Sequence, residues 1–123
     1  MLAHKHLVVR AEVDKPLVNK NKAIKFLRSL IKKIKMKPMY GPTASYCKMK
    51  GNRGITAFAI IETSHIAMHI WDETQPALVQ LDVYSCSDFT PKTVFEHIET
   101  MIPTKIDYKF LDREQKFIQV LEK

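Results

Sequence analysis

Residues 54–86 read GITAFAIIETSHIAMHIWDETQPALVQLDVYSC and hold the most apolar runs of the chain, its single tryptophan and two of its five histidines. The run over residues 55–61 is rich in branched and aromatic side chains and has the length of a buried strand. A second run, residues 66–71, follows with no glycine or proline between the two. Thr63 and Ser64 therefore form either a bulge in one long strand or a tight corner between two strands.

Three polar residues, Thr63, Ser64 and His65, interrupt this otherwise apolar segment. Burying a hydroxyl or an imidazole costs about 1–3 kcal/mol unless the group is hydrogen-bonded. A sequence that keeps three such groups inside a core segment satisfies them or uses them. We therefore expect the chemistry of the protein to lie at this point.

Outward from this stretch, apolar periodicity predicts a strand, a helix, four strands, a second helix and a further strand. Asn21 is expected to cap a helix that runs to about residue 35, and Thr90 followed by Pro91 is a typical helix start. The tail from Arg113 is either a strand or a short helix. The expected strands cover residues 6–13, 43–50, 55–61, 66–71, 78–85 and 105–111. This order predicts an α+β fold, a two-layer sandwich with a mainly antiparallel sheet and helices packed on one face.

Length and composition indicate one globular domain over residues 1–123, large enough to bury a core unaided. No apolar run approaches the roughly 20 residues of a membrane span, and the N-terminus lacks a signal-peptide layout. These features predict a cytoplasmic protein with no membrane partner. Cys47 and Cys86 fit no metal-ligand spacing and no disulfide framework, so we expect reduced thiols and no metal site.

The formal net charge of +7 is concentrated in residues 20–37, which carry eight basic residues and no acidic one. Such a face attracts anions, and a solvated helix face explains it equally well. The charges are not interleaved with exposed aromatic residues, and no nucleic-acid-reading motif is present. The sequence therefore does not favour nucleic acid as the partner.

The central stretch resembles the prokaryotic S-adenosylmethionine decarboxylases. GITAFAIIETSHIAMHIWDE followed by LDVYSC is similar to the family pattern G-V-S-G-x-x-x-I-x-E-S-H-L-x-I-H-T-W-P-E followed by V-D-V-F-T-C-G. The usual opening H-L-I-V of the family is matched by HLVV at residues 6–9. The resemblance covers most of residues 4–102, whereas residues 104–123 have no clear counterpart and form a C-terminal extension of the domain.

Members of this family are small enzymes of polyamine synthesis that are made as proenzymes. The resemblance implies self-cleavage of the bond between Thr63 and Ser64, in which the serine hydroxyl attacks the preceding carbonyl and the serine remnant becomes a pyruvoyl cofactor. This group would form a Schiff base with S-adenosylmethionine and act as the electron sink for its decarboxylation. The implied product is the aminopropyl donor for spermidine synthesis, and the implied active unit is a homodimer.

The resemblance also implies a role for each matching residue. Ser64 is the implied pyruvoyl precursor, and Thr56 and His69 are the implied processing residues. Cys86 matches the cysteine that returns a proton to the decarboxylated carbon. The implied substrate-binding residues are Trp71, which would stack on adenine, Glu73, which would bind the ribose hydroxyls, and His65.

Several positions depart from the family pattern. Thr63 stands where the family has glutamate, Asp72 where it has proline, and Ser87 where it has glycine. The chain between His69 and Cys86 is about two residues longer than usual, and the second aromatic of the adenine site has no clean match. These departures affect the rate of processing and the recognition of adenine.

Taken one at a time, these residues have ordinary structural explanations. A lone strand serine such as Ser64 more often bonds to backbone, and a histidine such as His69 is more often a satisfied core residue. Cys86 alone would be a small buried hydrophobe, and Trp71 alone would be core. Their joint spacing is what supports the resemblance.

Two other functions remain open. The altered adenine pocket and the added acidic residue would suit decarboxylation of a basic amino acid such as ornithine or arginine. Trp71 and Glu73 argue against this, because a substrate without a nucleoside would have no adenine or ribose for them to bind. A relative that no longer cleaves could instead act as a binding or regulatory protein. It would contact a processed paralogue, or an anionic partner through residues 20–37.

Overall fold

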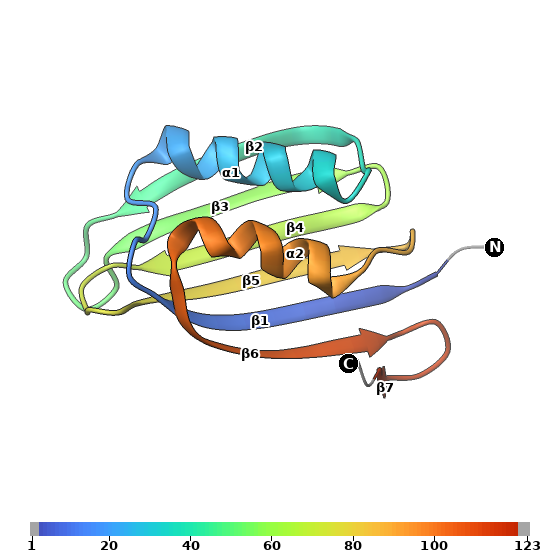
Figure 1. Ribbon diagram of the computed structural model, residues 1–123. Coiled ribbons are helices and arrows are strands. Elements are labelled where there is room, and N and C mark those ends of the chain that lie inside the picture. The colour runs from blue at the N-terminus through green and yellow to red at the C-terminus, as the bar shows by residue number, and fades with distance from the viewer. Residues whose placement is uncertain (1–2, 121–123) are drawn as a thin grey trace.

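The computed structural model of the protein describes residues 3–120. Its elements follow in the predicted order, with one further short strand at the end (Figure 1). They are β1 (Lys5–Val13), α1 (Lys20–Lys33), β2 (Pro38–Cys47), β3 (Gly54–Ile61), β4 (Ser64–Trp71), β5 (Ala77–Ser85), α2 (Pro91–Ile98), the 3₁₀ turn η1 (Glu99–Met101), β6 (Pro103–Asp112) and β7 (Ile118–Gln119).

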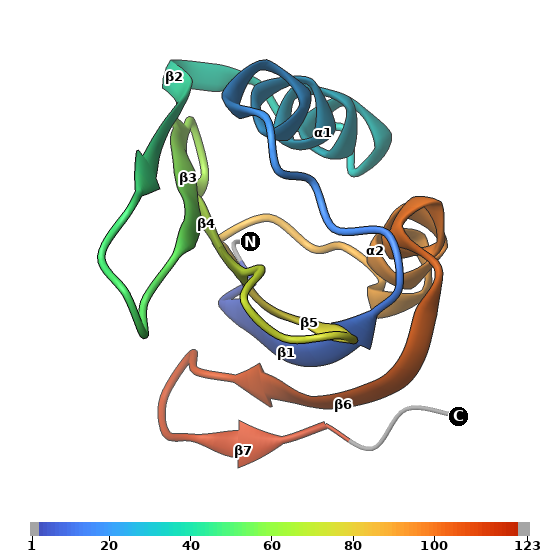
Figure 2. The ribbon, with the colours of Figure 1, turned by 90° about the vertical axis from the view of Figure 1, so that its left-hand side faces the viewer.

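The strands form one antiparallel sheet in the order β2-β3-β4-β5-β1-β6-β7. Both helices lie on the same side of this curved sheet, as the end view shows (Figure 2). The predicted α+β two-layer fold is therefore confirmed. The side of the sheet without helices is called the open face below.

Residues alternate between the two faces of the sheet because successive strand side chains point in opposite directions. In β4, Ile66, Met68 and Ile70 are buried beneath the helices. The alternate positions of the four central strands make up the open face: Thr56, Phe58 and Ile60 of β3; His65, Ala67, His69 and Trp71 of β4; Gln80, Asp82 and Tyr84 of β5; and His6, Val8 and Arg10 of β1.

Helix α1 packs against β2 and β3 through a buried stripe that includes Leu27 and Leu30. Its N-cap is Asn19 rather than the predicted Asn21, because the Asn19 side chain accepts hydrogen bonds from the backbone amides of Asn21 (2.8 Å) and Lys22 (3.3 Å). Helix α2 begins at Pro91 as predicted, behind Thr90 in extended conformation. The hydroxyl of Thr90 does not cap the helix and bonds instead to that of Thr93.

The structure also corrects several boundaries. The strand predicted over residues 43–50 is β2, which begins at Pro38 and ends at Cys47. Proline is tolerated at its start because β2 is an edge strand. The strand predicted from residue 66 is β4, which begins at Ser64. The strand predicted over residues 105–111 is β6, one or two residues longer at each end, and the tail from Arg113 contributes the strand β7. Of the two alternatives for Thr63 and Ser64, the tight corner between two strands is the one observed.

A glycine at the start of β3 fixes the close approach of β4. Gly54 pairs with Trp71 and adopts a φ of 150°, and a Cβ atom there would lie 1.7 Å from the Ile70 carbonyl oxygen. Only glycine fits at this position. None of the helices within residues 3–120 is long and apolar enough to span a membrane.

Candidate active site

The turn between β3 and β4 has two residues, Glu62 and Thr63, and brings Ile61 opposite Ser64. Two-residue hairpin loops need positive φ values, which are normally supplied by glycine or asparagine in the loop. Here the positive φ falls on Ser64, at 141°. A residue with a Cβ atom is strained by about 1–3 kcal/mol in such a conformation. The backbone is therefore strained at the bond that the sequence singles out.

The carbonyl group of Thr63 is hydrogen-bonded to the neighbouring strand. The backbone amide of Cys86 donates to the Thr63 carbonyl oxygen at 2.7 Å, and Ser64 lies opposite Ser85 in the register of β4 and β5. A donor aimed at a carbonyl oxygen stabilises negative charge that develops when a nucleophile attacks the carbon. The fold thus brings Cys86 to the predicted cleavage site, at the start of β4.

Two side chains that the sequence did not single out support the turn. The Ser85 hydroxyl donates to the Thr63 hydroxyl at 3.0 Å. The Thr63 hydroxyl in turn donates to the Met36 sulfur at 3.0 Å. The Ser85 oxygen also accepts the backbone amide of Ser87 at 2.9 Å. Ser85 is fully buried, so this small network satisfies polar groups that would otherwise be costly. The only sequence signal for Ser85 was its place directly before Cys86.

A second group of candidate residues lies on the open face. The Thr56 hydroxyl is 3.0 Å from Nδ1 of His69, because the two residues are paired in the register of β3 and β4. The ring of His69 stacks on that of Trp71, with 5.6 Å between centroids and 22° between planes. These three side chains line one small pocket of about 260 Å³. Hydroxyl, imidazole and indole are therefore together on the open face.

The loop between β2 and β3 borders this pocket through Asn52. Nε1 of Trp71 donates to Oδ1 of Asn52 at 2.7 Å, a contact that the sequence did not suggest. Oε1 of Glu73 accepts the backbone amide of Arg53 at 3.1 Å. The amides of Arg53 and Gly51 hold the pKa of the Glu73 carboxyl below its usual value, so this exposed group stays charged.

The two groups of residues are far apart within one chain. Ser64 and His69 are the first and sixth residues of β4, which separates them by roughly 16 Å at the rise of an extended strand. Ser64 is level with Ser85, whereas His69 is level with Gln80. The structure thus brings Thr63, Ser64 and Cys86 together at one end of β4, and Thr56 with His69 and Trp71 toward the other.

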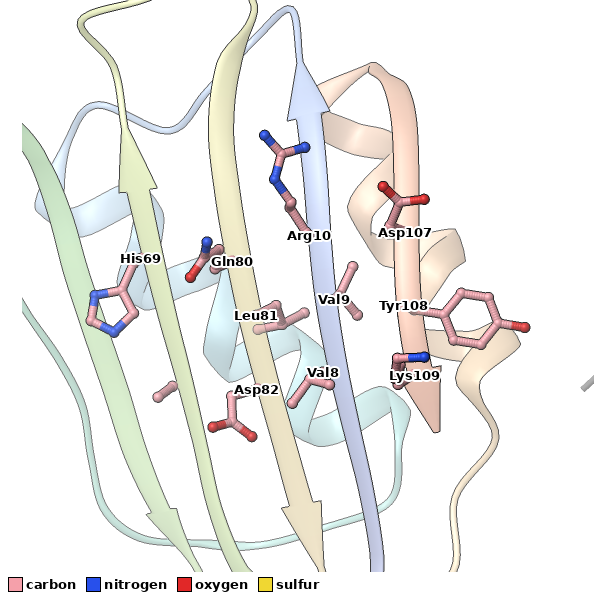
Figure 3. A pocket seen from close by; sticks show the side chains of 11 residues that line it. Val8, Val9, Arg10, His69, Gln80, Leu81, Asp82, Asp107, Tyr108 and Lys109 are labelled. Carbon is pink, nitrogen blue, oxygen red and sulfur yellow. The ribbon is translucent and has the colours of Figure 1, made fainter. Parts of the chain in front are cut away.

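A broad concavity of about 770 Å³ lies on the open face. His69, Gln80 and Asp82 lie on one side of it, and Arg10 and Lys109 on the other (Figure 3). His65, expected to bind substrate, is exposed on the same face with its ring 5.7 Å from that of Tyr84. Cys47 and Cys86 are both free thiols.

Comparisons with known proteins agree with the resemblance seen in the sequence. The S-adenosylmethionine decarboxylase proenzymes of Pyrobaculum islandicum and Pyrobaculum arsenaticum are each 45% identical to the chain over 64 residues, which are 50% of this chain and 50% of those proteins. The matching stretch thus spans about half the length of these curated relatives. The crystal structure of the adenosylmethionine decarboxylase from Aquifex aeolicus has the same fold, with a TM-score of 0.66 and 22% identity, covering 99% of this chain and 98% of that one. The family model described as S-adenosylmethionine decarboxylase matches residues 5–114. The chain therefore belongs to the S-adenosylmethionine decarboxylase family.

Proposed function

We propose that the chain is the proenzyme of a pyruvoyl-dependent S-adenosylmethionine decarboxylase that cleaves itself between Thr63 and Ser64. The observation that carries this proposal is the 2.7 Å hydrogen bond from the Cys86 amide to the Thr63 carbonyl oxygen, next to a strained Ser64. A polarised carbonyl and a strained serine on its C-terminal side are what an internal acyl shift needs.

The cleavage follows from the groups at this turn. Oγ of Ser64 attacks the carbonyl carbon of Thr63, so that a C–O bond forms, the C–N bond breaks and an ester replaces the peptide. Loss of the Ser64 Cα proton then expels the carboxylate of Thr63 as the end of the upstream chain. Water replaces the nitrogen of the remaining dehydroalanine, and ammonia leaves. The Cys86 amide would stabilise the oxyanion of the first step.

The residues present fit a pyruvoyl group at position 64 for two reasons. Cleavage before Ser64 would relieve the strained backbone there. Cys86, whose amide contacts the Thr63 carbonyl oxygen, also has a free thiol. When present, the pyruvoyl group supplies an electron sink for the loss of carbon dioxide. Cys86 would return a proton to the substrate carbon. Trp71, Glu73 and His65 would bind the rest of S-adenosylmethionine, with an aromatic face favourable to its sulfonium charge.

We further propose that the active unit is a homodimer in which two open faces pack together. The open face has exposed apolar residues, with Phe58 at 40% and Ile60 at 43% exposure, and no helix within residues 3–120 covers it (Figure 2). His69 lies roughly 16 Å from Ser64 within one chain. Because β4 carries these two residues near its opposite ends, a two-fold axis across β4 would bring the end with His69 and Thr56 of one copy to the end with Ser64 of the other, and would form two equal sites.

Intact-mass measurement of the purified protein tests the function. Self-cleavage gives a fragment that ends at Thr63 and a second fragment, residues 64–123, lighter than its hydrolysis product by one ammonia. The cleaved protein should then release carbon dioxide from S-adenosylmethionine and give the aminopropyl donor for spermidine synthesis. A chain that stays whole on long incubation would contradict the proposal. Release of carbon dioxide from ornithine or arginine, and not from S-adenosylmethionine, would show that the substrate is a basic amino acid.

A further inference from the structure

The segment after β6 places an arginine over the open face. The Arg113 backbone amide donates to the His4 carbonyl oxygen at 2.7 Å, which ties the segment to the start of β1. Its guanidinium carbon lies 4.4 Å from the centroid of the Tyr84 ring and 5.1 Å from that of Phe117. Contacts of this kind hold a guanidinium flat against aromatic faces. Arg113 is thus held between a strand residue and a residue of its own loop.

A hydrogen-bonded chain fixes the orientation of this guanidinium. Nη1 of Arg113 lies 3.0 Å from Nδ1 of His6, and Nε2 of His6 contacts the Asp82 carboxylate. Because a guanidinium can only donate, Nδ1 of His6 accepts and Nε2 carries the proton that it donates to Asp82. Arg113 is therefore held by one of its two terminal nitrogens. Within residues 3–120, Nε and Nη2 have no hydrogen-bond partner.

This guanidinium lies close to the proposed reaction centre. Tyr84, on which it stacks, is opposite His65 in the register of β4 and β5, and His65 directly follows Ser64. The keto carbon of a pyruvoyl group derives from the Cα of the serine, which lies in the plane of the sheet. A substrate bound there can extend onto the open face, where Arg113 is clamped over Tyr84.

We propose that Arg113 binds the carboxylate of the substrate, a proposal that rests on the proposed function. An α-amino acid held by its amine at position 64 has its carboxylate one carbon from that amine, within reach of a group beside His65. The unused N–H groups of a guanidinium match the two oxygens of a carboxylate. Arg113, near the end of the range that the family model matches, would thus contribute to substrate recognition.

A carboxylate-binding role for Arg113 can be distinguished from a purely structural role. An arginine that only anchors the C-terminal segment would affect every ligand equally, whereas a carboxylate-binding arginine would affect only ligands that carry the carboxylate. S-adenosylmethionine and its decarboxylated product differ by that group. Their affinities, measured side by side, therefore report on Arg113 directly.

The experiment compares the unaltered protein with Arg113→Met, Arg113→Lys and Arg28→Met. Arg28 is exposed on α1, so its replacement removes the same charge on the helix side of the sheet. In the cleaved protein the readouts are the KM for S-adenosylmethionine and the inhibition constant of the decarboxylated product. In the uncleaved Ser64→Ala protein, the readouts are the dissociation constants of the same two ligands, measured by calorimetry.

For Arg113→Met we expect the constant for S-adenosylmethionine to rise about tenfold or more, while that for the product changes less than about threefold. Arg113→Lys should raise the constant for S-adenosylmethionine by an intermediate factor, because lysine keeps the positive charge but cannot donate two parallel hydrogen bonds to a carboxylate. Arg28→Met should change neither constant. An equal change for both ligands, no change for either, or no binding of the carboxylate ligand in either form would overturn the assignment. If the protein does not cleave itself, the proposed function is wrong. The carboxylate-binding role of Arg113 is then still tested by the ratio of the two dissociation constants in the Ser64→Ala protein.

Discussion

The backbone amide of Cys86 donates a hydrogen bond of 2.7 Å to the carbonyl oxygen of Thr63. This contact joins the residue after β5 to the turn before β4 and puts a fixed dipole on the carbonyl that the proposed cleavage attacks. The thiol of Cys86 takes no part in the contact. The two halves of this residue can therefore serve two steps, the amide in cleavage and the thiol in decarboxylation.

Replacing Cys86 by alanine should separate these steps. The Cys86→Ala protein keeps the backbone amide, so we expect self-cleavage at close to the original rate. Turnover of S-adenosylmethionine should fall at least about 100-fold, because a positioned proton donor contributes about that much. Mass spectrometry follows the first step and release of labelled carbon dioxide the second. Loss of both activities together, in a protein that still melts cooperatively, would refute the division.

The strained φ of 141° at Ser64 makes a prediction about stability. Neither Ser64→Gly nor Ser64→Ala can cleave, so both report on the intact chain. Glycine adopts a positive φ without strain, so Ser64→Gly should be the more stable by about 1 kcal/mol, or roughly 4 °C in Tm. At Ser29, exposed within α1, the order should reverse, since glycine destabilises a helix relative to alanine. The same order at both positions would mean that Ser64 is not strained.

Mixed dimers test whether His69 acts on the Ser64 of its partner. Neither Ser64→Ala nor His69→Ala should cleave alone. Co-expressed with different tags, the two should form mixed dimers in which the His69→Ala chain is cleaved, because its Ser64 meets an intact His69 of the other copy. The double variant Ser64→Ala/His69→Ala is the matched partner that should restore nothing. Mixed dimers that stay uncleaved would place the processing histidine elsewhere.

The sequence predicted local features of the fold well. The apolar runs over residues 55–61 and 66–71 predict two strands, and β3 and β4 are found there. The start of α2 at Pro91 likewise follows from its local signal. Such features depend on residues a few positions apart, so pattern reasoning reaches them.

Features that depend on register between distant strands were not predictable in the same way. Nothing in the spacing of His69 and Ser64 says whether their side chains meet, because five residues along an extended strand put them roughly 16 Å apart. The Ser85–Thr63–Met36 network joins three separate elements, and the contact of Arg113 with His6 spans most of the chain. The single-domain assignment of residues 1–123 stays a prediction.

A buried histidine between the two helices should make the stability of the fold depend on pH. His97 of α2 is 5% exposed, and its ring lies 4.4 Å from that of Phe26 in α1. Nε2 lies 2.9 Å from the Phe26 carbonyl oxygen and therefore carries the proton, while Nδ1 has no partner within the described residues. Burial lowers the pKa of His97 below its usual value, and the positive charge of Lys33 acts in the same direction, against the hydrogen bond to Phe26.

The direction of the pH effect follows from this pKa. Below about pH 6.5 the unfolded chain binds a proton at His97 that the folded chain excludes, so stability falls as the pH drops toward the folded-state pKa. In His97→Gln the side-chain amide can still donate to the Phe26 carbonyl but does not titrate. The loss of Tm between about pH 7.5 and pH 5 should therefore be smaller in His97→Gln than in the unaltered protein. His65→Gln, on the exposed open face, should leave that loss unchanged. An identical pH profile for His97→Gln and the unaltered protein would show that His97 titrates equally in both states.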